Sequence, residues 1–145
     1  MKSLLGCIVL MGLSLAALAA EPTTAPAKSP SPPGATVYFI EPANGAVVPT
    51  MFTVKFGLKG MGIAPAGTDI ANTGHHHLLI DQATLPDMSL PLPATDKIVH
   101  FGKGQTEAEV TLPPGQHTLQ LVFANYLHIP HDPPVVSKPI TITVK

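Results

Sequence analysis

Proline and glycine divide this chain into short segments, which limits its possible folds more than any other feature. The 145 residues include 17 prolines and 12 glycines, and both residue types disfavour the interior of a helix. No window longer than a turn or two combines helical periodicity with capping residues. The apolar and β-branched residues fall instead into short runs, as expected for strands.

The alternation is clearest in residues 52–58, where Phe52, Val54, Phe56 and Leu58 share one face. Seven strands are predicted, at residues 36–41, 52–58, 76–81, 97–101, 106–112, 116–123 and 139–144. Seven short antiparallel strands in about a hundred residues predict an all-β fold, an immunoglobulin-like antiparallel sandwich.

The N-terminus has the pattern of a signal peptide over residues 1–20. Lys2 precedes an apolar stretch at residues 4–18, and small residues at 17–20 offer a cleavage site. Cys7 follows a lipoprotein-like Leu-Leu-Gly sequence, but most of the apolar stretch comes after it, so we interpret Cys7 as part of the discarded peptide. A retained membrane anchor is the alternative, although the stretch is shorter than the roughly 20 residues of a spanning helix. The pattern predicts a periplasmic or secreted protein.

After this peptide the chain divides into two predicted parts. Residues 21–34 are rich in proline and are expected to be a disordered tether, and residues 35–145 are expected to form one β-sandwich domain. The mature chain would contain no cysteine, which excludes a disulfide scaffold and a thiolate metal site. It contains no arginine and no basic patch, so nucleic acid is a poor candidate partner.

Histidine is therefore the main reactive side chain. If the seven predicted strands are A to G in order, the loops B–C, D–E and F–G gather at one end of an immunoglobulin-like sandwich. His75, His76 and His77 would lie where loop B–C enters strand C, His100 at the end of strand D, and His128 and His131 in loop F–G. On a strand, His75 and His77 share one face and His76 lies on the other. The predicted metal ligands are His75, His77, His128 and His131, with His100 in reserve.

Imidazole suits copper and zinc, so the predicted function is a histidine site for one of these ions. The alternative is a structural or interaction module of the cell envelope, whose histidines form only a hydrogen-bond network. His117 falls at the opposite end of the sandwich and is expected to be structural. Asp81 and Asp132 could accept an imidazole N–H or cap turns.

Enzymatic motifs fit the sequence poorly. It contains neither an HExxH nor a Gly-x-Ser-x-Gly motif and no phosphate-binding glycine loop. We therefore expect a non-catalytic protein whose partners are a metal ion and an envelope protein.

Four motifs carry a family resemblance. They are GHHHLLID at residues 74–81, HFGKGQT at 100–106, LPPGQHTL at 112–119 and HIPHDPP at 128–134. In this order they resemble a family of exported bacterial proteins known as domain of unknown function 4399, over residues 47–144. The resemblance implies an exported β-domain with no established activity. The segment Asn125-Tyr126-Leu127 departs from the more acidic, histidine-bearing stretch expected of the family at this place.

Overall fold

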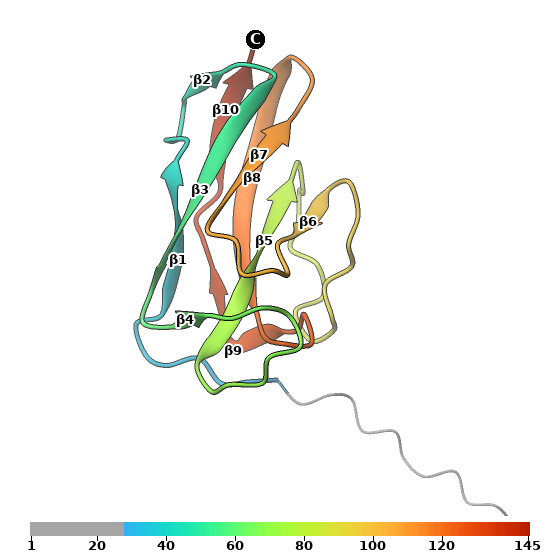
Figure 1. Cartoon of the computed structure of the whole chain (residues 1–145). Coiled ribbons are helices and arrows are strands. Elements are labelled where there is room, and N and C mark those ends of the chain that lie inside the picture. The colour runs from blue at the N-terminus through green and yellow to red at the C-terminus, as the bar shows by residue number, and fades with distance from the viewer. Residues whose placement is uncertain (1–27) are drawn as a thin grey trace, which may run out of the picture.

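The computed structural model describes residues 28–145, which form strands and loops arranged in two sheets (Figure 1). The predicted signal peptide and residues 21–27 lie outside this range. The strands are β1 (Thr36–Glu41), β2 (Val47–Val48), β3 (Met51–Lys59), β4 (Gly62–Ile63), β5 (Thr73–Ile80), β6 (Ile98–His100), β7 (Glu107–Thr111), β8 (Gly115–Ala124), β9 (Pro130–Val136) and β10 (Ile140–Val144). No helix long and apolar enough to cross a membrane occurs in residues 28–145.

The smaller sheet has the order β1-β3-β7, and both of its pairings are antiparallel. The larger, seven-stranded sheet has the order β2-β10-β8-β5-β4, with β6 pairing β5 and β9 pairing β8. At its centre β5 and β8 are antiparallel, with Leu78 opposite Leu121. Strand β5 therefore has β8 along one side, while β4 and β6 share the other.

The main core lies between the two sheets. It combines Val54 and Phe56 of β3 with Leu78 of β5 and Leu121 and Phe123 of β8. These side chains are 0–3 % exposed. The alternating pattern of residues 52–58 therefore places its apolar face in the core, as the sequence predicts.

The outer face of the larger sheet carries a second apolar layer. Residues 81–97, which connect β5 to β6, form a cover segment over this face. Leu92 of the cover segment packs with Leu79, Val122 and Ala124 of the sheet in a separate buried cluster. Strand β5 is consequently buried on both faces, and seven of its eight residues are buried.

All seven predicted strands are present, and their ends differ from the predicted ones by no more than three residues. The all-β prediction is confirmed. Strands β2, β4 and β9 were not predicted, and β9 corrects the expectation that residues 128–131 lie together in one loop. Proline disfavours a central strand, but β9 lies beside β8 at the edge of the sheet, where a missing N–H is tolerated.

Part of the segment expected to be a disordered tether is ordered on the larger sheet. The N–H of Ser31 donates to the carbonyl oxygen of Asp132 (3.1 Å), and the N–H of Asp132 donates to that of Ser29 (3.0 Å). The Ser31 hydroxyl also donates to the Pro133 carbonyl (2.7 Å). Composition suggested disorder because the segment has few core-forming residues, whereas these contacts use backbone groups that composition does not report.

Gly74 permits the close approach of β5 to β8. A Cβ atom at this position would collide with the carbonyl oxygen of Ala124 and contact the ring of Phe123. We expect Gly74→Ala to lower the free energy of unfolding by about 1–3 kcal/mol, because backbone must move to relieve the overlap. Urea denaturation measures the change. Thr53→Ala, on the exposed face of β3, serves as the control, and equal stability of the two variants would contradict the expectation.

Candidate metal centre

The three consecutive histidines of β5 point to opposite faces of the strand. His75 and His77 face the outer layer, while His76 faces the core between the sheets and packs against Phe56 and Phe123 at ring-centroid distances of 4.9 and 5.1 Å. All three are no more than 1 % exposed. The alternation expected of a strand is therefore present, and only His75 and His77 can share a site.

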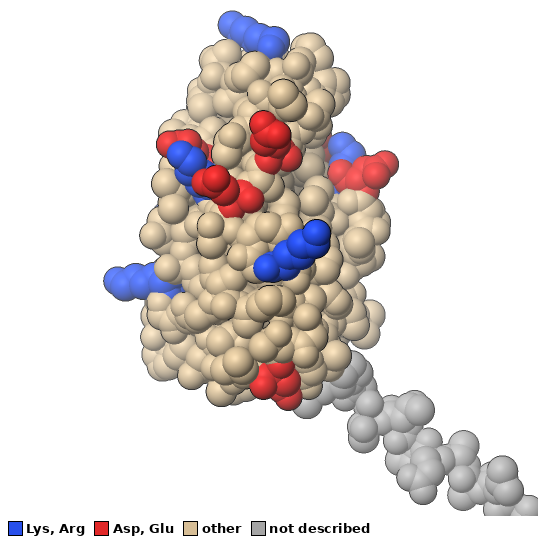
Figure 2. Space-filling model, viewed as in Figure 1, with Lys and Arg blue, Asp and Glu red and all other residues tan. Residues whose placement is uncertain are grey.

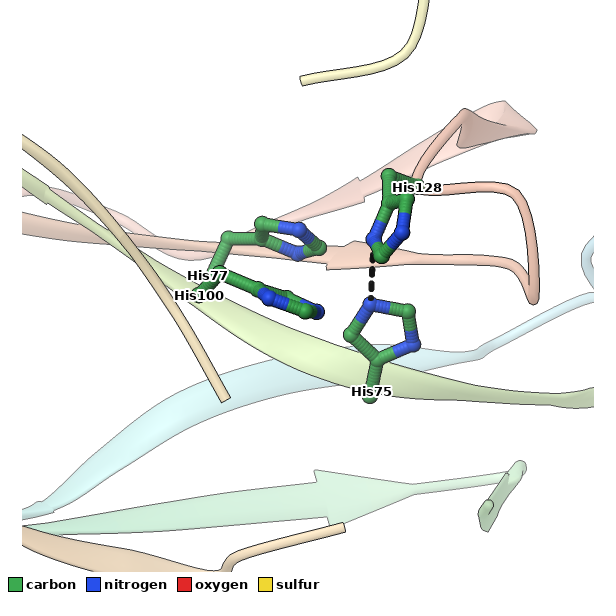
Figure 3. A group of neighbouring side chains, drawn as sticks. All are labelled: His75, His77, His100 and His128. Atoms are coloured by element: carbon green, nitrogen blue, oxygen red, sulfur yellow. Dashed lines mark hydrogen bonds between the residues drawn. The ribbon is translucent and has the colours of Figure 1, made fainter. Parts of the chain in front are cut away.

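Two further histidines complete a group of four, shown in Figure 3. His100 on β6 lies opposite His77 in the strand register, and His128 lies in the turn between β8 and β9. Each residue of the group offers one ring nitrogen, and these four nitrogens all lie within 4.8 Å of one another. We call His75, His77, His100 and His128 the four-histidine group. Four of the five predicted ligands are thus brought together.

The rings of the four-histidine group face one another at short range. Their centroids lie 4.5–5.9 Å apart in every pair. Nε2 of His75 lies 3.1 Å from Nδ1 of His128. A tetrahedral zinc ion bound at about 2.0 Å by each nitrogen holds its ligand atoms roughly 3.3 Å apart. This pair already meets that spacing, and ring rotation can bring the others closer.

Four of the eight ring nitrogens of the group are buried without a hydrogen-bond partner. Within the described chain, Nδ1 of His75, both nitrogens of His77 and Nε2 of His100 are buried and unpaired. Buried polar atoms are nearly always paired, and leaving one unpaired costs about 1–3 kcal/mol. One hydrogen bond between His75 and His128 does not amount to a network. One ring nitrogen from each of the four histidines lies close enough to the others that together they could hold a metal ion.

The turn that carries His128 is held by Asn125. The side-chain oxygen of Asn125, which is 1 % exposed, accepts the N–H groups of Leu127 (2.9 Å) and Ile129 (3.0 Å). His128 itself has a positive φ of 66°, an uncommon conformation that the surrounding structure must hold in place. The sequence marked residues 125–127 only as unusual for the family. Their role in placing His128 depends on contacts that the sequence does not show.

Burial keeps the deepest rings neutral. Burial lowers the pKa of His75 to about 3, with further lowering from His100 and His128. Burial likewise lowers the pKa of His77 to about 2, again assisted by its histidine neighbours. The pKa of His100 is lowered by burial and by His128. Neutral imidazole is the form that binds metal, so these three rings are in the ligand form at neutral pH.

His131, predicted as a ligand, is not part of the four-histidine group. It lies on β9 with its ring stacked on Phe123 at 5.8 Å, toward the core between the sheets. Its ring nitrogens face the carbonyl oxygens of Phe123 (3.4 Å) and Thr73 (3.2 Å). The prediction placed it beside His128 because both were assigned to one loop. In the structure β9 begins between them, and the strand directs His131 elsewhere.

His117 lies away from the group and connects loops. Its Nδ1 is 2.8 Å from a carboxylate oxygen of Asp81, and its Nε2 is 2.9 Å from the Pro113 carbonyl oxygen. The hydrogen bond to Asp81 raises the pKa of His117. Burial alone would raise the pKa of Asp81, but hydrogen bonds from His117, Thr118 and Lys97 lower it overall. Asp81 thus pairs with His117 and makes no hydrogen bond to the four-histidine group.

Comparisons with known proteins identify a family match. A family model described as Domain of unknown function (DUF4399) matches residues 54–145, which is more than half of the chain. The matched region contains all four histidines of the group and the four motifs noted in the sequence. No curated protein and no solved structure matches the chain.

Removing the Asn125 side chain should loosen the His128 turn. We expect Asn125→Ala to lower the free energy of unfolding by about 1–3 kcal/mol, because two backbone N–H groups, that of Ile129 being buried, lose their acceptor. Asn44→Ala is a matched control, since the exposed Asn44 accepts one backbone N–H, from Thr141 (2.8 Å). Chemical denaturation of both variants makes the comparison. A smaller loss for Asn125→Ala than for Asn44→Ala would contradict this account of the turn.

The metal-free protein should lose stability in mild acid. Burial lowers the pKa of His76 to about 4, and the pKa values of His75 and His77 are lower still. Below their ordinary value of 6.5, the unfolded chain takes up protons that the folded chain does not, so the free energy of unfolding falls as the pH drops toward about 4. His117 acts in the opposite sense, because its raised pKa stabilises the fold at low pH. It is one histidine against five whose pKa is lowered, since burial also lowers the pKa of His100 and His131.

Urea midpoints at pH 7.5, 6.0 and 5.0 measure this loss. His76→Phe should make the decline with pH shallower, since phenylalanine takes up no proton and suits the aromatic neighbours of His76. A stability that stays constant between pH 7.5 and 5.0 would show that the buried rings are not held neutral.

Proposed function

We propose a metal-binding function for this chain, which belongs to the DUF4399 family. The four-histidine group would bind one transition metal ion, copper or zinc. The observation that carries this proposal is the close approach of the four histidines, each of which offers one ring nitrogen within 4.8 Å of the other three, in a group where four ring nitrogens are buried without a hydrogen-bond partner. A bound ion would satisfy one nitrogen of each ring and remove repulsion between neighbouring lone pairs. A purely structural hydrogen-bond network would leave Nδ1 of His75, both nitrogens of His77 and Nε2 of His100 unsatisfied.

The donor set favours binding over catalysis. Catalytic zinc sites keep one coordination position open for water or substrate and usually have three protein ligands. Four histidines would fill a tetrahedral shell and leave no such position. We therefore infer a role in holding or delivering the ion, without a chemical reaction.

The proposal includes the fold type and the location. The sheet pairings support an immunoglobulin-like sandwich. This fold places its strands A, B and E in one sheet and C, F and G in the other. Taken in chain order, the corresponding strands here are β1, β3 and β7 in one sheet and β5, β8 and β10 in the other. The signal-peptide pattern of residues 1–20 supports export to the periplasm or beyond.

The surface suits a small ligand better than a polyanion. On the face shown in Figure 2, lysines lie singly and are separated by acidic and neutral residues. The formal net charge of the whole sequence is −1. This face offers nucleic acid no continuous positive area, whereas a metal ion needs only the local ring nitrogens.

Metal ions should raise the unfolding temperature of the metal-stripped protein at pH 7.5. A ligand at about 100 times its dissociation constant stabilises the folded state by about 2.7 kcal/mol, which corresponds to about 10 °C for a domain of this size. Zn(II) and Cu(II) are added separately in thermal unfolding scans. Binding stoichiometry is measured by titration calorimetry, and one ion per chain is expected. The shift should largely persist at pH 5, because burial already keeps the rings of His75 and His77 neutral in the folded protein.

His128→Ala should abolish the metal-induced shift, because it removes a ligand that lies in a turn and not in the core. His117→Ala is the matched control, since it alters a histidine outside the group, and it should keep the shift even if its metal-free stability is lower. If neither ion binds saturably to the unaltered protein at pH 7.5, the metal-binding proposal is wrong.

A further inference from the structure

We propose that the ion held by the four-histidine group is Cu(I), and this inference rests on the metal-binding function proposed above. Three properties of the surroundings distinguish a monovalent from a divalent ion: the charge of the donors, the partners of the second ring nitrogens and the polarity of the neighbouring side chains.

The donors carry no negative charge. The group consists of four histidines, which bind as neutral rings, and includes no carboxylate among the described residues. The bound complex would therefore keep the full charge of its ion. The cost of burying a charge rises with its square, so a divalent complex costs about four times as much as a monovalent one. Asp81, for which an imidazole partner was one of two predicted roles, pairs with His117 and Lys97.

In the two buried histidines of the group, the second ring nitrogen lacks a charge-dispersing partner. Histidines that bind a divalent ion usually donate their other N–H to a carboxylate, a carbonyl or water, which makes the ring a stronger donor. Both nitrogens of the buried His77 are without a partner within the described chain, and so is Nδ1 of His75. Whichever nitrogen of His77 binds the ion, the other lacks an acceptor for its proton. Such rings stabilise the higher charge of Cu(II) or Zn(II) poorly.

The neighbouring side chains are apolar. Leu79 follows His77 on the same face of β5, and it packs with Leu92 of the cover segment and with Val122 of β8. The N–H of Leu92 donates to the carbonyl oxygen of His128 (2.9 Å), so the cover segment lies directly beside the group. This layer offers little polarity to solvate a doubly charged complex.

The group nevertheless leaves a route for the ion. His75 and His77 are buried, whereas His100 and His128 are half-buried. An ion can reach the two outer rings first and the two inner rings next. The ligand nitrogens are up to 4.8 Å apart, which is wider than a tetrahedral zinc set at about 3.3 Å. Cu(I) accepts two, three or four imidazoles, so it can be held by the first rings that it meets before all four close around it.

Competition titrations on the mature chain test the inference. Cu(I) affinity is measured without oxygen against bicinchoninate, and Cu(II) and Zn(II) affinities are measured against chromophoric chelators at the same pH. We expect Cu(I) to bind at least about 100-fold more tightly than Cu(II). An equal or weaker affinity for Cu(I), with saturable binding of Cu(II) or Zn(II), overturns this inference and leaves the metal-binding function standing. Absence of binding by all three ions overturns both.

A charge variant tests the cause of the preference. His100→Glu replaces one imidazole with an anionic donor. His100→Gln replaces the same imidazole with a neutral side chain of the same size as glutamate. We expect the glutamate variant to lower the ratio of Cu(I) to Cu(II) affinity by at least about tenfold relative to the glutamine variant. Asn44→Asp adds a negative charge at an exposed position on another loop and should leave the ratio unchanged.

Circular dichroism establishes that each variant is folded. If His100→Glu does not fold, the pair His128→Glu and His128→Gln replaces it, because His128 is the other half-buried ligand. Equal ratios in the glutamate and glutamine variants would show that donor charge does not select the ion, and the inference would fall.

Discussion

The burial of β5 on both faces is the constraint on which the rest of the structure depends. Its residues alternate between two apolar layers, the core between the sheets and the layer under the cover segment. A polar side chain on this strand has no access to solvent on either side. His75, His76 and His77 must therefore find partners within the protein or remain unpaired. Because His75 and His77 lie on the face where two further histidines are close, this burial produces a candidate metal site.

The two environments of β5 separate three identical residues. His76 sits among phenylalanines, where it gains aromatic packing but no hydrogen bond. His75 and His77 face other histidines, so that each offers one ring nitrogen within 4.8 Å of those of His100 and His128. A polar atom without a partner is a cost wherever it is buried. On the face that carries His75 and His77, several ring nitrogens lie close enough together for one bound ion to offset the free-energy cost of burying them. None of the four-histidine group lies on the face that carries His76.

Local patterns in the sequence predicted much of this arrangement. Alternation identified the seven main strands and separated His76 from its neighbours, because both follow from the geometry of a single strand. His131 and β9 were misplaced because prolines suggested a loop, whereas edge pairing with β8 makes a strand of residues 130–136. The contact between Asn125 and Ser29 was not predictable either, since it joins residues 96 positions apart in the chain. Long-range pairing, which local pattern does not encode, accounts for each of these differences.

The same long-range contacts connect the candidate site to the rest of the molecule. Asn125 holds the turn that carries His128, and its amide donates to Ser29 (2.9 Å) in the N-terminal segment. The backbone of His128 accepts from Leu92 of the cover segment. One outer ligand is therefore fixed by three separate parts of the chain, while the inner ligands are fixed by the central strand. An ion bound to all four rings would join the turn to β5 and β6, so its binding energy would add to the stability of contacts that the fold already makes.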